Sequence, residues 1–170
     1  NGTRFFLDTI IDRIGENDLV WVHDYQLMLL PQMLRERRPG ARIGFFLHIP
    51  FPSFEVFRIL PWREQLLQGV LGADLVGFHT YEYCRHFLSS LRRITGIEHS
   101  LGQFSYMERV VRADVFPMGI DPSIFGGPLR SASERRELRV LQKRIRSRKM
   151  IISVDRLDYT KGIPERLIAF

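Results

Sequence analysis

The chain alternates between short apolar runs of strand length and longer stretches with helical spacing. Apolar runs lie at residues 19–22, 42–47, 75–78 and 110–116, and stretches of helical spacing lie at residues 4–14, 27–38, 55–71 and 83–94. This rhythm is typical of βαβ units on a parallel sheet. The apolar runs show little polar alternation, which predicts an α/β fold with helices on both faces of a Rossmann-like sheet.

The pattern changes after residue 116. A loop at 117–122 is followed by Gly126, Gly127 and Pro128, which predict a join between a first domain at 1–127 and a second domain beginning at 128. In residues 128–170 we expect a basic helix, a strand at 150–154 and a helix that begins near Pro164. No strand precedes the first helix and the last helix is short, so we expect an internal piece of a longer protein.

Composition favours a globular protein of the cytoplasm. Of the 170 residues 45% are hydrophobic and 12% aromatic, enough to bury a sizeable core. The single cysteine, Cys84, has no internal disulfide partner. The apolar runs are too short to span a bilayer, and no secretory signal is visible.

The net charge of +6 is concentrated in one segment. Residues 130–149 contain nine Arg or Lys and two Glu, so the rest of the chain is slightly negative. A basic helix of this kind is more often a solvated face than a polyanion-binding surface. No aromatic residue interleaves with these charges, so we expect no nucleic-acid partner. Nucleic-acid binding through this segment would predict an affinity that falls steeply with salt concentration.

Candidate functional residues follow the strands, because ligands bind at the carboxyl ends of strands in open parallel sheets. Asp24 follows the first strand, where its carboxylate can accept hydrogen bonds from sugar hydroxyls or simply cap the next helix. His48 follows the second strand before a loop stiffened by two prolines, which can hold its imidazole in place, although a lone His beside an apolar strand is more often a structural residue of the core. His79 follows the third strand and is expected to be structural.

A loop at residues 155–164 has the outline of a diphosphate site. Arg156 and Lys161 lie on a short loop that precedes the start of a helix, where the helix dipole also favours an anion. The glycine spacing of a Walker loop is missing. A further polar segment at 58–64 is better explained as a surface helix with a buried Trp.

Five segments together resemble the trehalose-6-phosphate synthases, a family with the GT-B fold, in which two Rossmann-like domains face each other across a cleft. The segments are VWVHDY at 20–25, IGFFLHIPFP at 43–52, ADLVGFHT at 73–80, FPMGID at 116–121 and VDRLDYTKG at 154–162. They occur in family order and span nearly the whole chain. The resemblance implies an enzyme that transfers glucose from UDP-glucose to glucose-6-phosphate with retention, giving trehalose-6-phosphate and UDP.

The resemblance also implies roles for individual residues. Asp24 matches the residue that binds hydroxyls of the acceptor, and His48 matches the one that contacts the donor glucose. Arg156 and Lys161 match the basic pair on the donor diphosphate, where they would stabilise the departing UDP. No metal or other cofactor is then expected. Other contacts of the family lie outside these residues, so this piece alone is expected to be inactive.

Three alternatives stay open. The first is a related GT-B transferase with another phosphorylated acceptor, such as a glucosylglycerol-phosphate synthase. The second is a non-catalytic regulatory subunit, and the third is nucleic-acid binding through residues 130–149. The sequence leaves open the donor base, a homo-oligomer and a fused phosphatase domain. No membrane partner is expected.

Overall fold

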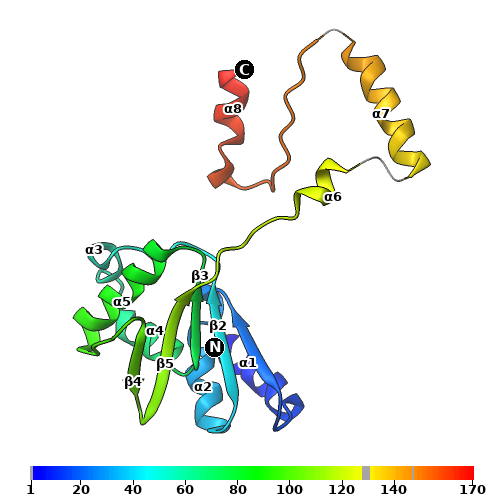
Figure 1. Ribbon diagram of the computed structural model, residues 1–170. Helices are drawn as coiled ribbons and strands as arrows, with labels where there is room; N and C mark the ends of the chain where they lie inside the picture. The colour runs from blue at the N-terminus through cyan, green and yellow to red at the C-terminus, as the bar shows by residue number, and fades with distance from the viewer. Residues whose placement is uncertain (1, 128–130, 147) are drawn as a thin grey trace. The chain divides into compact units, whose positions relative to one another are not determined.

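The computed structural model describes residues 2–127, 131–146 and 148–170 and divides the chain into two compact units, 1–119 and 120–170 (Figure 1). The first unit therefore ends before the predicted join at 126–128, where Pro128 lies outside the described residues. Each unit has its own internal contacts.

Unit 1–119 is built on a five-stranded sheet with the order β1-β2-β3-β5-β4. Strands β1, β2, β3 and β5 are parallel, and β4 pairs with β5 antiparallel. The predicted parallel α/β sheet is thus confirmed, while the β4–β5 hairpin at the edge was not predicted. The bounds of the strands are Leu19–His23 (β1), Arg42–Leu47 (β2), Leu75–Phe78 (β3), Gln103–Tyr106 (β4) and Arg109–Val115 (β5).

The helices of this unit connect the strands. The expected helix over residues 55–71 is wrong, because the structure has two helices there with Pro61 between them. A proline has no N–H to donate and its ring obstructs the preceding turn. The α-helices are Gly2–Ile10 (α1), Leu30–Arg37 (α2), Phe54–Phe57 (α3), Arg63–Val70 (α4) and Tyr81–Thr95 (α5), with 3-10 turns at Ile11–Arg13 (η1) and Tyr25–Leu27 (η2).

The core lies on one face of the sheet. Helices α1, α2, α4 and α5 contact one another in that order and form a single layer (Figure 1). Sheet residues that point toward them, such as Phe45, Val76 and Val111, are buried. On the opposite face Leu19 and Trp21 are 68% and 62% exposed. The expectation of helices on both faces is therefore met on one face within the described residues.

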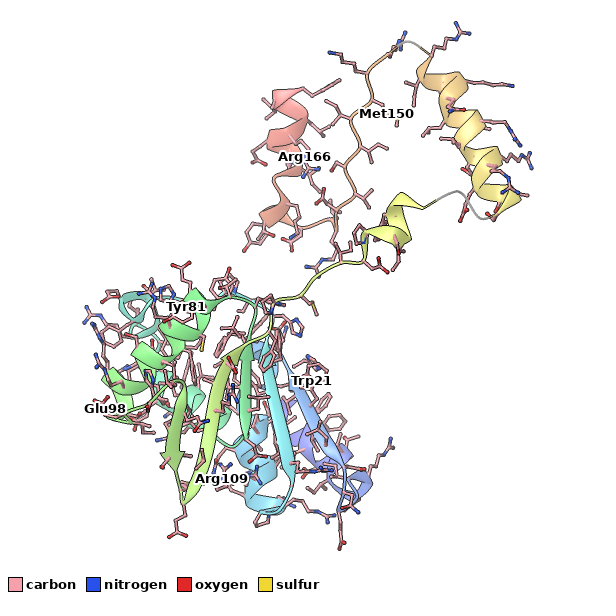
Figure 2. All side chains as sticks on the ribbon, viewed as in Figure 1. Trp21, Tyr81, Glu98, Arg109, Met150 and Arg166 are labelled. Carbon is pink, nitrogen blue, oxygen red and sulfur yellow. The ribbon has the colours of Figure 1, made fainter. Side chains whose placement is uncertain are left out.

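Asp74 joins the elements at the amino ends of the strands. Its Oδ1 accepts from Arg35 Nη2 at 2.7 Å and from Arg109 Nη1 at 3.1 Å, and its Oδ2 accepts from the Ile43 N–H at 2.8 Å. The Asp74 N–H donates to the Ile43 carbonyl, and the Arg112 N–H donates to the Asp74 carbonyl. Asp74, which directly precedes β3, thereby links α2, β2 and β5. Figure 2 shows Arg109 at this end of the sheet.

Arg35 extends this network to three loop carbonyls. Its guanidinium donates to the carbonyl oxygens of Gly72, Pro39 and Ala41 at 2.6–3.1 Å, and its side chain is only 10% exposed. Burial, and then repulsion by Arg35, lowers the pKa of Arg109, whereas the Asp74 carboxylate opposes that shift. Asp74 is therefore what allows two guanidinium groups to lie side by side.

Unit 120–170 contains helices and connecting segments. Its elements are Pro122–Gly126 (α6), Ala132–Ile145 (α7), Tyr159–Lys161 (η3) and Ile163–Ala169 (α8). The basic helix is confirmed as α7, which begins with a capping box between Ser131 and Glu134 and buries no residue. Arg130 of the basic segment lies outside the described residues.

The strand expected at residues 150–154 is not formed. The segment has no strand partner among the described residues, and Ile151, Ile152 and Val154 are each at least 66% exposed. A strand requires a neighbour for its backbone N–H and C=O groups, which β-branched side chains alone do not supply. The helix expected near Pro164 is confirmed as α8. In the parts of the chain described, no helix has the length and apolarity needed to cross a membrane.

Replacing Arg35 by Met should lower the free energy of unfolding by about 2–4 kcal/mol, because Asp74 and three carbonyls lose their buried donor. Arg37→Met on the same helix is the matched control, since the Arg37 side chain is exposed and forms a long ion pair with Asp8 at 3.8 Å. The control should cost less than about 1 kcal/mol. Urea unfolding followed by circular dichroism measures both, and equal shifts would contradict the role given to Arg35.

Candidate functional site

The carboxyl ends of β1, β2 and β3 bring four polar side chains together. His23 ends β1, Asp24 follows it, and His48 and His79 come directly after β2 and β3. Because the three strands are parallel neighbours, these positions lie along one edge of the sheet. The structure therefore unites Asp24 and His48, the two site residues that the sequence predicts for this unit.

Asp24 is held in an unusual backbone conformation. Its φ of 69° is uncommon for a residue with a side chain, although Asp tolerates it better than most. The Asp24 N–H donates to the Phe46 carbonyl at 2.8 Å. Its Oδ1 accepts from the Tyr25 N–H at 3.0 Å and from the His48 N–H at 3.3 Å. The carboxylate thus caps η2 and also links β1 to the loop after β2.

The His48 ring is surrounded by other rings. His23 Nδ1 lies 2.8 Å from His48 Nε2, within hydrogen-bonding distance. The ring centroids of Phe46 and His79 lie 4.9 and 5.5 Å from that of His48. Trp21 packs against His23 with a centroid separation of 4.6 Å. His48 is therefore held by its neighbours as well as by the prolines behind it.

Sequence reasoning noted the imidazole of His23 beside Asp24 as a hydrogen-bond donor but did not include it among the site residues, and it treated His79 as structural. Trp21 precedes His23 by two residues on β1, so the two side chains lie on the same face of the strand. Phe46 on β2 likewise precedes His48 by two residues. Two-residue periodicity places all of these side chains on the face that the helices leave uncovered. Together with the parallel order of the strands, that periodicity could have grouped the three histidines.

A hollow of about 700 Å³ extends from this edge along the uncovered sheet face. Most of its lining is apolar, including Leu19, Trp21, Phe46 and Met118. A phosphorylated sugar needs hydrogen bonds for its hydroxyl and phosphate groups, which such a surface does not offer. We therefore place the candidate site at the histidine edge of the hollow.

Gly77 on β3 keeps this face open for the ring of Phe46. A Cβ added at Gly77 would lie 2.6 Å from Phe46 Cδ2 and 3.2 Å from Phe116 Cδ2. Phe46 in turn contacts both His48 and His79. The absence of a side chain at Gly77 therefore supports the positions of the two histidines.

The buried thiol of Cys84 is not a nucleophile for this site. Burial on α5, followed by the nearby Asp114 charge, raises the pKa of Cys84 to about 11. The thiolate is the reactive form of cysteine and is scarce at neutral pH under these conditions.

In unit 120–170, Arg156 and Lys161 lie on one short loop with Asp158 between them. Asp158 accepts hydrogen bonds from the N–H and the hydroxyl of Thr160, at 3.0 and 2.9 Å. These bonds, with smaller contributions from the charges of Lys161 and Arg156, lower the pKa of Asp158. Both cations therefore act on the same small region, and both are exposed.

The loop is anchored at its two ends. Asp155 accepts from Ser153 Oγ and from Arg166 Nη1, both at 2.7 Å, and Arg166 Nη2 donates to the Lys161 carbonyl. Gly162 takes a φ of 58° where η3 gives way to α8, and α8 begins without a side-chain cap. Cations, a left-handed glycine and an uncapped helix start are features that favour an anionic group.

A metal site is not evident in the described part of the chain, where no three His, Cys, Asp or Glu side chains are arranged to hold an ion. The three histidines of the site are placed for contact with one another. Their chemistry is that of hydrogen-bond donors and acceptors, which suits uncharged hydroxyl groups.

Comparison with known proteins places these residues in a family. Residues 2–170 match the model of glycosyltransferase family 20. The chain is 50% identical over 171 residues to a UDP-forming alpha,alpha-trehalose-phosphate synthase 2 of Aspergillus niger, covering 98% of this chain and 36% of that protein. It is 48% identical over 164 residues to synthase A of Dictyostelium discoideum, covering 96% of this chain and 22% of that protein. The chain thus spans about a fifth to a third of these relatives.

Solved structures agree. The UDP-forming synthase of Burkholderia xenovorans in complex with glucose-6-phosphate has a TM-score of 0.86 at 33% identity, over 99% of this chain and 38% of that one. The Escherichia coli protein bound with UDP-2-fluoro glucose has a TM-score of 0.83 at 35% identity, over 99% and 37%.

The N-terminal domain of Candida albicans trehalose-6-phosphate phosphatase has a TM-score of 0.84 at 38% identity, over 97% and 36%. These likenesses confirm the predicted GT-B class of α/β fold. The family match extends over nearly the whole chain, residues 2–170. The chain belongs to glycosyltransferase family 20.

Proposed function

We propose that this chain forms part of an enzyme that transfers glucose from UDP-glucose to glucose-6-phosphate with retention, giving trehalose-6-phosphate and UDP. The observation that carries the proposal is the direct link between Asp24 and His48 at the carboxyl edge of the sheet, within a chain that matches the family throughout. The relatives are named for this reaction, and two similar structures are described with a UDP-glucose analogue and with glucose-6-phosphate.

In this proposal Asp24 binds the acceptor and His48 the donor glucose. Backbone N–H groups engage Oδ1 of Asp24, so the carboxylate is already oriented before a sugar arrives. A fixed carboxylate can accept two hydroxyl hydrogen bonds without losing further side-chain entropy. The link from Oδ1 to the His48 N–H keeps the acceptor and donor contacts in register.

Arg156 and Lys161 bind the donor diphosphate and stabilise the negative charge that forms on the departing UDP. The acceptor attacks from the face that the diphosphate leaves, which accounts for retention without a protein nucleophile. Two cations and the start of α8 supply the positive charge that a metal would otherwise give, so the proposal includes no metal or other cofactor. We further propose a cytoplasmic location, with no nucleic-acid partner and no membrane partner. A homo-oligomer and a fused phosphatase domain are both compatible with this proposal.

The second candidate is a non-catalytic role beside an active transferase or phosphatase. It is favoured by the likeness to the N-terminal domain of a trehalose-6-phosphate phosphatase. A transferase with a different phosphorylated acceptor, such as a glucosylglycerol-phosphate synthase, is a third.

A UDP-release assay on the complete protein that carries this sequence separates these candidates. UDP-glucose is the donor, and glucose-6-phosphate, glycerol-3-phosphate or no acceptor is added. Release that depends on glucose-6-phosphate supports the proposal, and release only with glycerol-3-phosphate supports the related transferase. If no acceptor and no nucleotide donor gives release, the non-catalytic role is favoured. Residues 1–170 alone are also expected to release no UDP.

Arg156→Ala and Lys161→Ala should each lower kcat by about 10²–10³-fold, because a charge on the leaving diphosphate goes unbalanced. Lys143→Ala on α7 removes the same charge from an exposed helix and serves as the control. Steady-state kinetics with both substrates measures the effect. Near-normal rates in both loop variants would refute the diphosphate assignment.

Asp24→Asn separates binding from capping. The amide keeps an acceptor oxygen for the Tyr25 N–H and tolerates the positive φ, so the unfolding midpoint should stay close to that of the wild type. Loss of the carboxylate should raise the acceptor KM by about 10- to 100-fold, the range for one hydrogen bond to a charged group. A destabilised variant with an unchanged KM would show that Asp24 acts only as a cap.

Treatment with a chelator should leave the transfer rate unchanged, because Arg156 and Lys161 supply the charge at the leaving group. The rate is measured before and after dialysis against EDTA, with Mg²⁺ added back as the control. A rate that falls with EDTA and returns with Mg²⁺ would contradict the metal-free proposal.

A further inference from the structure

We propose that His23 is a positioning residue that holds His48 in the tautomer with its proton on Nε2, so that His48 offers a bare Nδ1 as a hydrogen-bond acceptor. The effect on catalysis rests on the proposed function, whereas the effect on the tautomer does not. His23 is outside the set of residues that the sequence predicts for the site.

The contact between the two rings allows only certain proton arrangements. His23 Nδ1 and His48 Nε2 are 2.8 Å apart, so one nitrogen must carry the shared proton and the other must accept it. If His48 Nε2–H donates, both neutral rings are in the Nε2–H form. If His23 Nδ1–H donates, both are in the Nδ1–H form. The Nε2–H form is the more stable one for a free neutral histidine, so the first arrangement is favoured.

The surroundings of His48 hold its ring in place, so the main property that can still vary is which ring nitrogen carries the proton. Its main-chain N–H is bound to Asp24 Oδ1, and its ring lies between those of Phe46, His23 and His79. Trp21 packs on the outer side of His23 and limits rotation of that ring too. Because the rings are held, the hydrogen bond at one nitrogen determines the state of the other.

The pair therefore presents a defined pattern to a ligand. Within the part of the chain that the structure describes, His48 Nδ1 and His23 Nε2 have no hydrogen-bond partner. In the favoured arrangement the first is an acceptor and the second a donor. A sugar hydroxyl can donate to His48 Nδ1 while a neighbouring oxygen accepts from His23 Nε2–H. Without the hydrogen bond to His23, His48 would exchange between its two tautomers and would offer this pattern only part of the time.

Nitrogen-15 NMR of the histidine-labelled 170-residue chain in mildly alkaline buffer tests the tautomer without any substrate. The His48 signals are identified by their loss in His48→Gln. In the wild type Nε2 should be protonated and Nδ1 bare, and His23→Phe, which keeps a ring against Trp21, should give a tautomer mixture. An Nδ1–H signal in the wild type, or the same single tautomer in His23→Phe, would overturn the proposal.

Two amide variants separate the hydrogen bond from the shape of the ring. His23→Asn places an amide oxygen near the position of Nδ1 and should restore the Nε2–H form of His48. His23→Gln carries its amide one methylene further out, nearer to the position of Nε2, and should not restore it. Equal spectra for the two amide variants would contradict an action through Nδ1.

Kinetics of the complete protein test the consequence. His23→Phe should lower kcat/KM by about 2- to 12-fold, the range of one net hydrogen bond, and His23→Asn should recover most of that loss. Equal losses in both variants would show that His23 acts through its ring. A wild-type protein without any transfer would refute the proposed function, and the NMR result would still decide whether His23 positions His48.

Discussion

The arrangement of the sheet depends on Asp74 at the amino ends of the strands. This carboxylate accepts from Arg35 of α2, from Arg109 of β5 and from the Ile43 N–H of β2. The Asp74 N–H in turn donates to the Ile43 carbonyl. A shift of one residue in any of these pairings would move side chains to the opposite face of the sheet. The register that brings His48 and His79 to one edge is therefore fixed at the other end of the same strands, and β1 with His23 is aligned by its pairing with β2.

The two units offer complementary chemistry. Unit 1–119 supplies one oriented carboxylate and a group of imidazoles, which suit hydroxyl groups, and unit 120–170 supplies two cations on an anchored loop, which suit a diphosphate. Each set is held by bonds within its own unit. A nucleotide sugar and a phosphorylated sugar present both kinds of group, so this division supports the transfer proposed above.

Local pattern was sufficient for the centre of the sheet. Strands β2 and β3 occupy the residues that their apolar runs predict. A buried parallel strand is a nearly continuous apolar run, so it can be located from its local composition alone. The break at Pro61 could have been predicted, because proline has no N–H to donate within a helix. Helical spacing on both sides of Pro61 instead suggested one continuous helix. Strand β4 was missed because Gln103 and Ser105 make its outer face polar, so the run lacks the apolar character of a central strand.

The site was predictable in part. Asp24 and His48 could be found from their positions at strand ends, whereas the hydrogen bond between His23 and His48 depends on the register of β1 against β2. The segment at 150–154 has strand propensity, but it pairs with no strand among the residues of unit 120–170 that the structure describes. Propensity describes what a segment favours, and pairing depends on residues far away in the sequence.

The most direct test of the account is a crystal structure of the complete protein with UDP and glucose-6-phosphate bound. The account predicts acceptor hydroxyls within hydrogen-bonding distance of the Asp24 carboxylate, and diphosphate oxygens in contact with Arg156 and Lys161. Glucose-6-phosphate bound away from Asp24, or a diphosphate that touches neither cation, would contradict it.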